Sequence, residues 1–189
     1  MNDSFYQLLL KAKESESPVA LYCNVESPRS FLAGWIEAVS SEHVVLRHLS
    51  PEGRYDGFVL KYLESIFRVD TEGRYIERLS YLFNARHQNF PTKLVGAHDE
   101  NSNLIIEILH GAAKEEMMVT IEIAAEDIEN GLVKDVGFET MTLEVYDHYG
   151  TIDREATIHL EAISEVRVDS ERLQSLKLLS NWTHLPGLE

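Results

Sequence analysis

Cysteine and long apolar runs are scarce in this chain of 189 residues. Cys23 is the single cysteine, so no disulfide can form within the chain, and a disulfide-stapled secreted scaffold is excluded. The apolar run at Leu8–Leu10 is far shorter than a signal sequence or a membrane span. We therefore expect a cytoplasmic protein without membrane contact, long enough to bury a core without metals or disulfides.

Basic residues are also in short supply. The chain has 17 Lys and Arg against 32 Asp and Glu, a formal net charge of −15. Residues 17–80 hold 7 basic and 9 acidic side chains, a balance of −2, whereas residues 117–175 hold 4 and 14, a balance of −10. Because nucleic acids attract proteins through Lys and Arg, the second segment argues strongly against RNA binding and the first only moderately.

Signatures of catalysis and of metal binding are missing. The sequence has no Cys-x-x-Cys or His-x-x-x-His pair, no glycine-rich phosphate loop and no serine elbow. Cys23 has no cationic neighbour in sequence that would lower its pKa, which favours a buried structural thiol over a nucleophile. We predict a protein that is not an enzyme and that has no cofactor and no metal site.

Two copies of one pattern, 97 positions apart, are present instead. Glycines, an aspartate, a Leu-Glu-x-Ile tetrapeptide and the apolar alternation coincide between the copies, and chance is a poor explanation for so many matches. We interpret the chain as a tandem duplication. The matched residues are Gly34 and Gly131, Gly53 and Gly150, Asp56 and Asp153, and Leu63-Glu64-Ser65-Ile66 and Leu160-Glu161-Ala162-Ile163.

Each copy is predicted to form five short strands. Apolar and polar residues alternate, which is typical of half-buried strands, and a glycine within the second strand marks a bend. Ser50–Gly53 and Asp147–Gly150 carry the residues of type I turns and join hairpins. The predicted strands are 21–25, 31–39, 43–49, 55–61 and 66–70, then 119–123, the run around Gly131, 140–146, 152–159 and 164–169.

Helical periodicity flanks both sets of strands. It predicts helices at 3–13 and 102–113 before the strands, and at 75–83 and 171–179 after them. The predicted fold class is mainly β with flanking helices (α+β), with two tandem five-stranded bent antiparallel barrels, each preceded by a short helix. The expected organisation is a first barrel domain at 1–83, a linker at 84–100, a second barrel domain at 101–180 and a tail at 181–189.

The apolar pattern from Phe31 to Val39 around Gly34, following a short helix, resembles the Sm-like (LSm) family, and the pattern around Gly131 does so again. The resemblance covers about residues 3–80 and 101–170, and implies small barrels that assemble into rings by strand pairing and grip single-stranded RNA with two loops. At the positions of the family's first RNA loop this chain has other residues, and the Arg-Gly pair of the second loop is absent from both copies. We carry no RNA-binding residue across. The departing residues are Ser40, Val44, Gly137 and Met141.

One group of residues could still bind an anionic ligand. Basic and aromatic side chains alternate on or beside one predicted hairpin of the first copy, and such surfaces stack bases and hold phosphates. The alternative is a solvated face with weak surface ion pairs. The residues are Arg47, His48, Arg54, Tyr55, Lys61 and Tyr62.

These observations predict a non-catalytic binding or assembly module. Small open barrels have edge strands that can add a strand from another molecule, so we expect a protein partner or self-association. The two barrels packing on each other in a monomer or dimer is a second arrangement. RNA binding through the first barrel is the alternative function, which the charge and the missing family residues disfavour.

Overall fold

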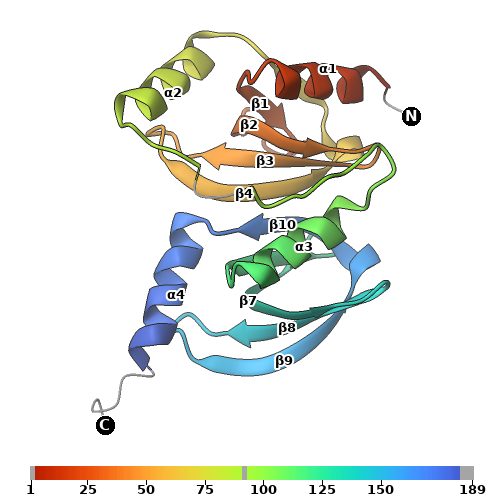
Figure 1. The fold of residues 1–189 in the computed structure, drawn as a ribbon, viewed down its shortest axis with the longest axis vertical. Coiled ribbons are helices and arrows are strands. Elements are labelled where there is room, and N and C mark those ends of the chain that lie inside the picture. Colours follow the sequence, from red (N-terminus) through yellow and green to blue (C-terminus); the bar gives the residue numbers. More distant parts are fainter. Residues whose placement is uncertain (1–2, 91–92, 184–189) are drawn as a thin grey trace. The chain divides into compact units, whose positions relative to one another are not determined.

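The computed structural model describes residues 3–90 and 93–183. The chain divides into two compact units, residues 1–104 (unit 1) and 105–189 (unit 2). Each unit consists mainly of antiparallel strands flanked by helices, as Figure 1 shows. Within the described residues no helix is both long and apolar enough to cross a membrane.

Unit 1 begins with a helix, continues through five strands and ends with a second helix. Its strands follow the order β5-β1-β2-β3-β4, and neighbouring strands pair antiparallel. The elements are α1 (Asp3–Glu14), β1 (Val19–Tyr22), β2 (Leu32–Val39), β3 (His43–Leu49), β4 (Tyr55–Tyr62), the 3-10 turn η1 (Leu63–Ser65), β5 (Arg68–Asp70) and α2 (Arg74–Ala85).

Unit 2 has the same succession of elements. Its strands follow the order β10-β6-β7-β8-β9 and again pair antiparallel. The elements are α3 (Leu104–Lys114), β6 (Met118–Ile123), β7 (Asp127–Val136), β8 (Thr140–Tyr146), β9 (Ile152–His159), η2 (Leu160–Ala162), β10 (Ile163–Val168) and α4 (Glu171–Thr183).

The predicted class, mainly β with flanking helices, is confirmed, but closure of the sheets into barrels is not. Among the described strands, β5 pairs only with β1 and β9 pairs only with β8. β5 has three residues, so it presents few backbone groups to a second neighbour. The glycine bends predicted from the sequence therefore curve the strands without closing the sheet.

Glycines at matched positions let the second and third strands of each unit approach closely. A Cβ on Gly34 would lie 1.9 Å from the carbonyl oxygen of Arg47, and one on Gly131 would lie 2.1 Å from that of Glu144. The ladder is also interrupted at matched places, between Ile36 and Ala38 and 97 positions later between Val133 and Asp135. Irregularities of this kind bend a strand, so both units curve at the same point.

The hairpin turns form where the sequence predicted them. The N–H of Gly53 donates to the carbonyl of Ser50 at 2.9 Å, and the N–H of Gly150 donates to that of Asp147 at 3.1 Å. Each turn touches the last helix of its unit, because a Cβ on Gly53 would lie 2.6 Å from Cβ of Leu82, and one on Gly150 only 2.5 Å from the backbone N of Ser180. The turns therefore fix where α2 and α4 sit.

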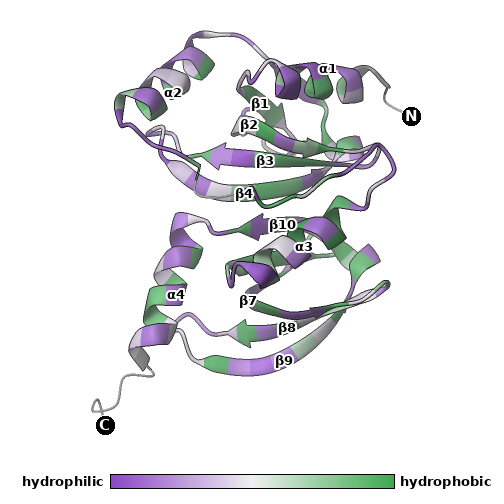
Figure 2. Ribbon diagram, in the orientation of Figure 1, coloured by the Kyte–Doolittle hydropathy of each residue, from purple (hydrophilic) through white to green (hydrophobic). Residues whose placement is uncertain are grey.

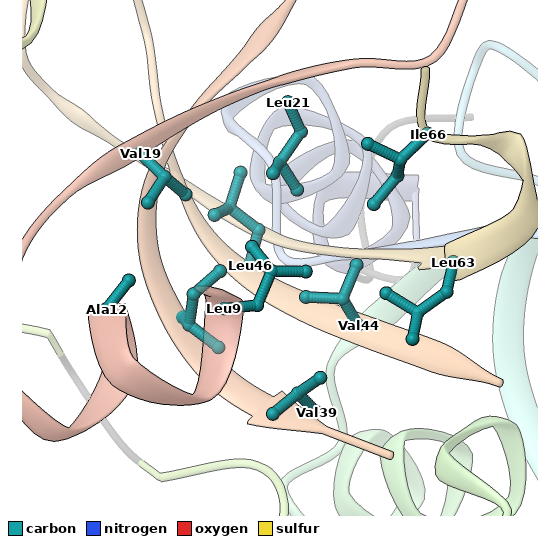
Figure 3. Packing of buried hydrophobic residues seen from close by; sticks show 10 residues of the cluster. Leu9, Ala12, Val19, Leu21, Val39, Val44, Leu46, Leu63 and Ile66 are labelled. Atoms are coloured by element: carbon teal, nitrogen blue, oxygen red, sulfur yellow. The ribbon is translucent and has the colours of Figure 1, made fainter. Parts of the chain in front are cut away.

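The inner core of unit 1 lies between α1 and one face of the sheet. Leu9 and Ala12, one helical turn apart, point from α1 toward apolar side chains of the strands, as Figure 3 shows. Burying such a face is the main reason why a short helix is stable in water. The buried strand and turn residues of this cluster are Val19, Leu21, Ile36, Val39, Val44, Leu46, Leu63 and Ile66.

An outer layer of unit 1 lies under α2 and is much larger than its counterpart under α4. In unit 1 it contains seven buried residues and the rings of Phe31, Trp35 and Phe90. In unit 2 the corresponding cluster has three buried residues, Met118, Tyr146 and Leu173, with Leu132 and Leu176 partly buried. The seven in unit 1 are Ala20, Tyr22, Ala33, Leu49, Ile76, Leu79 and Phe83.

The first strand is shorter than the alternation predicted. It ends at Tyr22 rather than at Val25, whose side chain is 77% exposed. The side-chain oxygen of Asn24 accepts hydrogen bonds from the N–H groups of Glu26 and Ser27, both at 3.0 Å. Asparagine competes with strand pairing in this way, so a turn replaces the end of the strand. Cys23 lies beyond the strand and is half-buried against the inner core.

Two predicted boundaries also differ. α2 extends to Ala85 and α4 to Thr183, so both helices reach into segments that we expected as linker and tail. Beyond Thr183 the expected tail lies outside the described residues. The segment expected as a linker contains the fully buried Val95 and the nearly buried Leu94, so it is packed structure rather than an exposed connection.

Candidate interaction surfaces

The predicted basic and aromatic residues do not form one surface. Arg47 and His48 are neighbours on β3, where successive side chains point to opposite faces of a sheet. The register pairs Arg47 with Trp35 and Phe58, and His48 with Gly34. On β4, Tyr55 stands at the first position and Lys61 and Tyr62 at the last two, so the strand separates them.

Arg47 is bound within unit 1. Its Nε donates to Oε2 of Glu37, whose side chain is fully buried, and its guanidinium carbon lies 5.0 Å from the centre of the Phe90 ring. The other oxygen of Glu37 accepts the N–H of Leu94 at 3.1 Å. Buried carboxylates need partners of this kind. Arg47 therefore neutralises Glu37 and is a poor candidate for gripping a phosphate.

Two of the other predicted residues, His48 and Tyr62, have neighbouring side chains within unit 1. Nδ1 of His48 lies 3.2 Å from Oδ2 of Asp56. The ring of Tyr62 lies 4.7 Å from that of the buried His43. Arg54, in the turn before β4, has an exposed side chain. Lys61 is partly buried.

Part of the predicted linker covers the outer face of unit 1, a role that the sequence did not indicate. We call residues 86–90 and 93–98 the strap. Gln88 accepts the N–H of Tyr55 at 3.0 Å and donates to the carbonyl of Gly53 at 2.8 Å. The ring of Phe90 lies 4.8 Å from Phe83, 5.4 Å from Trp35 and 6.0 Å from Tyr55. The strap thus places one aromatic ring among rings of β2, β4 and α2.

The strap also contacts α1. Nζ of Lys13 lies 2.9 Å from Nε2 of His98, whose Nδ1 lies 3.0 Å from the carbonyl of Gly96. Burial, with the nearby Lys93 adding to it, lowers the pKa of Lys13 below its ordinary value. Through His98 the strap is thus held against α1 as well as against the outer face.

Unit 2 has an ion pair at the positions of Glu37 and Arg47, with the charges exchanged. Lys134 Nζ lies 3.0 Å from Oε2 of Glu144, and the side chains are 48% and 19% exposed. The hydroxyl of Tyr146 donates to Oε1 of Glu144 at 3.0 Å. Burial, together with this hydrogen bond, raises the pKa of Tyr146 to about 12.

The outer face of unit 2 has no strap across it among the described residues. Leu132 and Leu176 are half-buried, while Ile152 is 45% exposed and Leu179 is 38% exposed. We call these four residues the open face. Tyr149, Leu178 and Trp182, which belong to the same turn and helix, are also exposed.

The strand β9 is a second exposed feature of unit 2. It has eight residues, of which Ile158 is buried and Ala156 partly buried. Its middle is hydrophilic (Figure 2) and contains Asp153, Arg154 and Glu155. Arg154 pairs with Asp153 and with Glu129 on β7. Charged residues are common on edge strands, where they limit uncontrolled pairing.

Within residues 3–90 and 93–183, no group of three or more His, Cys, Asp and Glu side chains is placed to hold a metal ion. No family model, no curated protein and no solved structure matches this chain. The geometry of the two units is therefore the basis for any functional proposal.

Proposed function

We propose that this protein is a non-catalytic assembly module that associates with further copies of itself through its edge strands. The single observation that carries the proposal is the open sheet: β9 hydrogen-bonds to β8 alone among the described strands and leaves one side of an eight-residue edge unpaired. An exposed edge strand is a template for pairing with another chain.

A matching edge exists in unit 1. β5 hydrogen-bonds only to β1 among the described strands, and it carries Arg68 and Asp70, which pair with each other at 2.7 Å. Phe67, immediately before β5, is 42% exposed. An edge with one charge of each sign suits the mixed charges of β9, since complementary charges set the register of an approaching strand.

The proposal includes a Sm-like character and a tandem duplication. Both are supported by the succession of helix, four strands, 3-10 turn, strand and helix in each unit, and by the matched glycines Gly34 and Gly131 with their equally close contacts. In this reading each unit is one module of an assembly built by strand addition.

RNA binding through unit 1 is the weaker alternative. Arg47 is taken up by Glu37 and Phe90, and the remaining predicted residues lie on separate parts of the hairpin. A nucleic-acid surface needs several cations along one path. Failure of oligonucleotides to bind at low salt would remove this alternative.

Self-association is tested with proline substitutions at neighbouring positions of β9. Consecutive residues of an antiparallel edge strand direct their N–H groups to opposite sides, so of Ala156→Pro and Thr157→Pro one breaks a bond to β8 and the other removes an outward donor. We expect light scattering to show concentration-dependent oligomers for the natural chain, and only monomers for the variant that keeps its thermal stability. A natural chain that stays monomeric at every concentration would contradict the proposal.

A further inference from the structure

We infer that the open face of unit 2 is a docking site for an extended peptide of a partner protein, with an aromatic side chain as its anchor and a Lys or Arg close to it. The inference extends the proposed binding function to a second surface. Its test measures peptide binding rather than self-association through the edge of β9, so the two proposals can fail separately.

In unit 1 the corresponding outer face is occupied by the strap, which shows what kind of segment can bind there. The strap lays Phe90 against Trp35, Tyr55 and Phe83 and seals the layer under α2. α2 begins at Arg74 and α4 begins 97 positions later at Glu171. The same offset relates the three rings around Phe90 to residues of unit 2. These are Leu132, Ile152 and Ser180.

The matched positions in unit 2 have smaller side chains and less cover. Leucine replaces Trp35, isoleucine replaces Tyr55 and serine replaces Phe83. Ser180 is buried, yet Ile152 is 45% exposed. Unit 2 therefore has no aromatic ring of its own at these positions and leaves part of an apolar face exposed, and aromatic rings contribute most per residue at such contacts. An aromatic anchor is therefore the fitting occupant.

The acidic charge of unit 2 is the reason to expect a Lys or Arg close to the aromatic anchor. At the position of Arg47, which lies over Phe90 in unit 1, unit 2 has Glu144, paired with the half-exposed Lys134. Residues 117–175 carry 4 basic and 14 acidic side chains, a balance of −10. A basic residue beside the anchor would approach an acidic unit and find Glu144 near it, since complementary potentials speed and orient association.

The test is a selection of random linear peptides, displayed on phage, against the immobilised full chain. Peptides enriched by the chain are re-measured by fluorescence polarisation against variants. We expect enrichment of sequences with an aromatic residue close to Lys or Arg. Ile152→Glu, which places a charge on the open face, should weaken their binding about tenfold or more. Glu144→Gln should weaken it less and reduce its dependence on salt.

Phe138→Glu is the matched control. Phe138 is 93% exposed and lies in the turn between β7 and β8, at the other end of β8 from Tyr146 and the turn that contacts α4. The same change of charge there should leave peptide binding unaltered. Thermal melting of each variant checks that the fold is intact, and Ile152→Ala, which removes apolar contact without adding charge, should also weaken binding if Ile152→Glu unfolds the unit.

Three results would overturn the inference. The first is a selection that enriches no peptide, or only peptides without basic residues. The second is binding that Ile152→Glu and Ile152→Ala leave unchanged. The third is binding that occurs only after residues 184–189 are deleted, because the chain's own end would then be the occupant.

Discussion

The two units place an ion pair at the same positions and use it differently. In unit 1 the pair is Glu37 and Arg47, and the carboxylate is completely buried, while in unit 2 it is Lys134 and Glu144, with side chains 48% and 19% exposed. In unit 1 the strap contacts both members of the pair, Glu37 through the N–H of Leu94 and Arg47 through the ring of Phe90. The difference shows that one strand scaffold supports either a sealed or an exposed outer face, depending on whether a further segment covers it.

Covering a face changes what its residues can do. A buried carboxylate needs partners to be stabilising, whereas a partly exposed ion pair contributes little to stability. This face is thus more fully covered in unit 1 than in unit 2. Trp35 in unit 1 and Trp182 in unit 2 are the two tryptophans of the chain, so Trp35→Phe and Trp182→Phe backgrounds let fluorescence report each unit separately.

The largest expected effects come from the bend glycines, where the units are alike. Gly34→Ala and Gly131→Ala would each drive a Cβ into a backbone carbonyl, 1.9 Å and 2.1 Å away. We expect the free energy of unfolding of the affected unit to fall by about 4 kcal/mol, as measured by urea denaturation. Gly96→Ala is the control, because no atom lies within 4 Å of its added Cβ. A small effect at either bend would contradict the shared curvature.

Acid should destabilise unit 1 through His43, which has no counterpart in unit 2. Burial lowers the pKa of His43 to about 4 from its ordinary 6.5. As pH falls below 6.5 the unfolded chain takes up the proton first, so stability declines until about pH 4. The loss should be on the order of 3 kcal/mol.

The measurement for His43 compares the pH dependence of stability in the natural chain and in His43→Leu. In His43→Leu the free energy of unfolding of unit 1 should decline less between neutral pH and the pKa of His43. Any decline that remains comes from other titrating groups, which are the same in both proteins. The matched residue in unit 2 is the exposed Thr140, so Trp182 fluorescence should show no change between them. Equal pH dependence in the two proteins would refute the assignment to His43.

Removing the ring of Phe90, which anchors the strap, should leave the outer face of unit 1 less covered, as the outer face of unit 2 is. Phe90→Ala deletes a ring that contacts Phe83, Trp35 and Tyr55. We expect unit 1 to lose about 2 kcal/mol, less than a fully buried phenylalanine would cost because Phe90 is only half-buried. Hydrogen exchange of the Tyr55 amide, which donates to Gln88, should accelerate. Phe138→Ala, at a 93% exposed site, is the control and should change neither quantity.

The smallest effects should come from the ion pairs, and they should differ in size. Arg47→Met leaves the buried Glu37 with the hydrogen bond from the N–H of Leu94 and should cost unit 1 about 1.5 kcal/mol, since Arg47 is itself partly exposed. Lys134→Met breaks a half-exposed pair and should cost unit 2 less than about 0.5 kcal/mol. Equal losses in denaturation experiments would show that burial of the pair is not what separates the units.

Local patterns predicted most of the elements. Alternation placed nine of the ten strands within two residues of their observed starts, and the turn residues at Ser50–Gly53 and Asp147–Gly150 formed their hydrogen bonds. The end of β1 was wrong because Asn24 bonds to nearby N–H groups, a local competition that hydrophobic alternation does not register. Periodicity also underestimated α2 and α4 by two to four residues at the C-terminal end.

Residues of the candidate surfaces were harder to predict. The hairpin cations could be identified as basic, but their partners could not: Arg47 meets Glu37 across ten residues, and Leu94 meets Glu37 across 57. Nothing in the local pattern of 84–100 distinguishes a packed strap from a loose linker. Phe90 between polar residues was the available signal, since a large apolar side chain in a linker often has a place to be buried.

The sequence by itself determined where this chain bends, turns and alternates, because these depend on neighbours within a few residues and on the missing side chain of glycine. It also determined the repeated spacing and the unequal charge of the two halves. Tertiary structure alone decided that the sheets stay open, that the strap covers unit 1, and that the pair at Lys134 and Glu144 is exposed while Glu37 is buried. Each of these depends on contacts between segments distant in sequence, which no local pattern encodes.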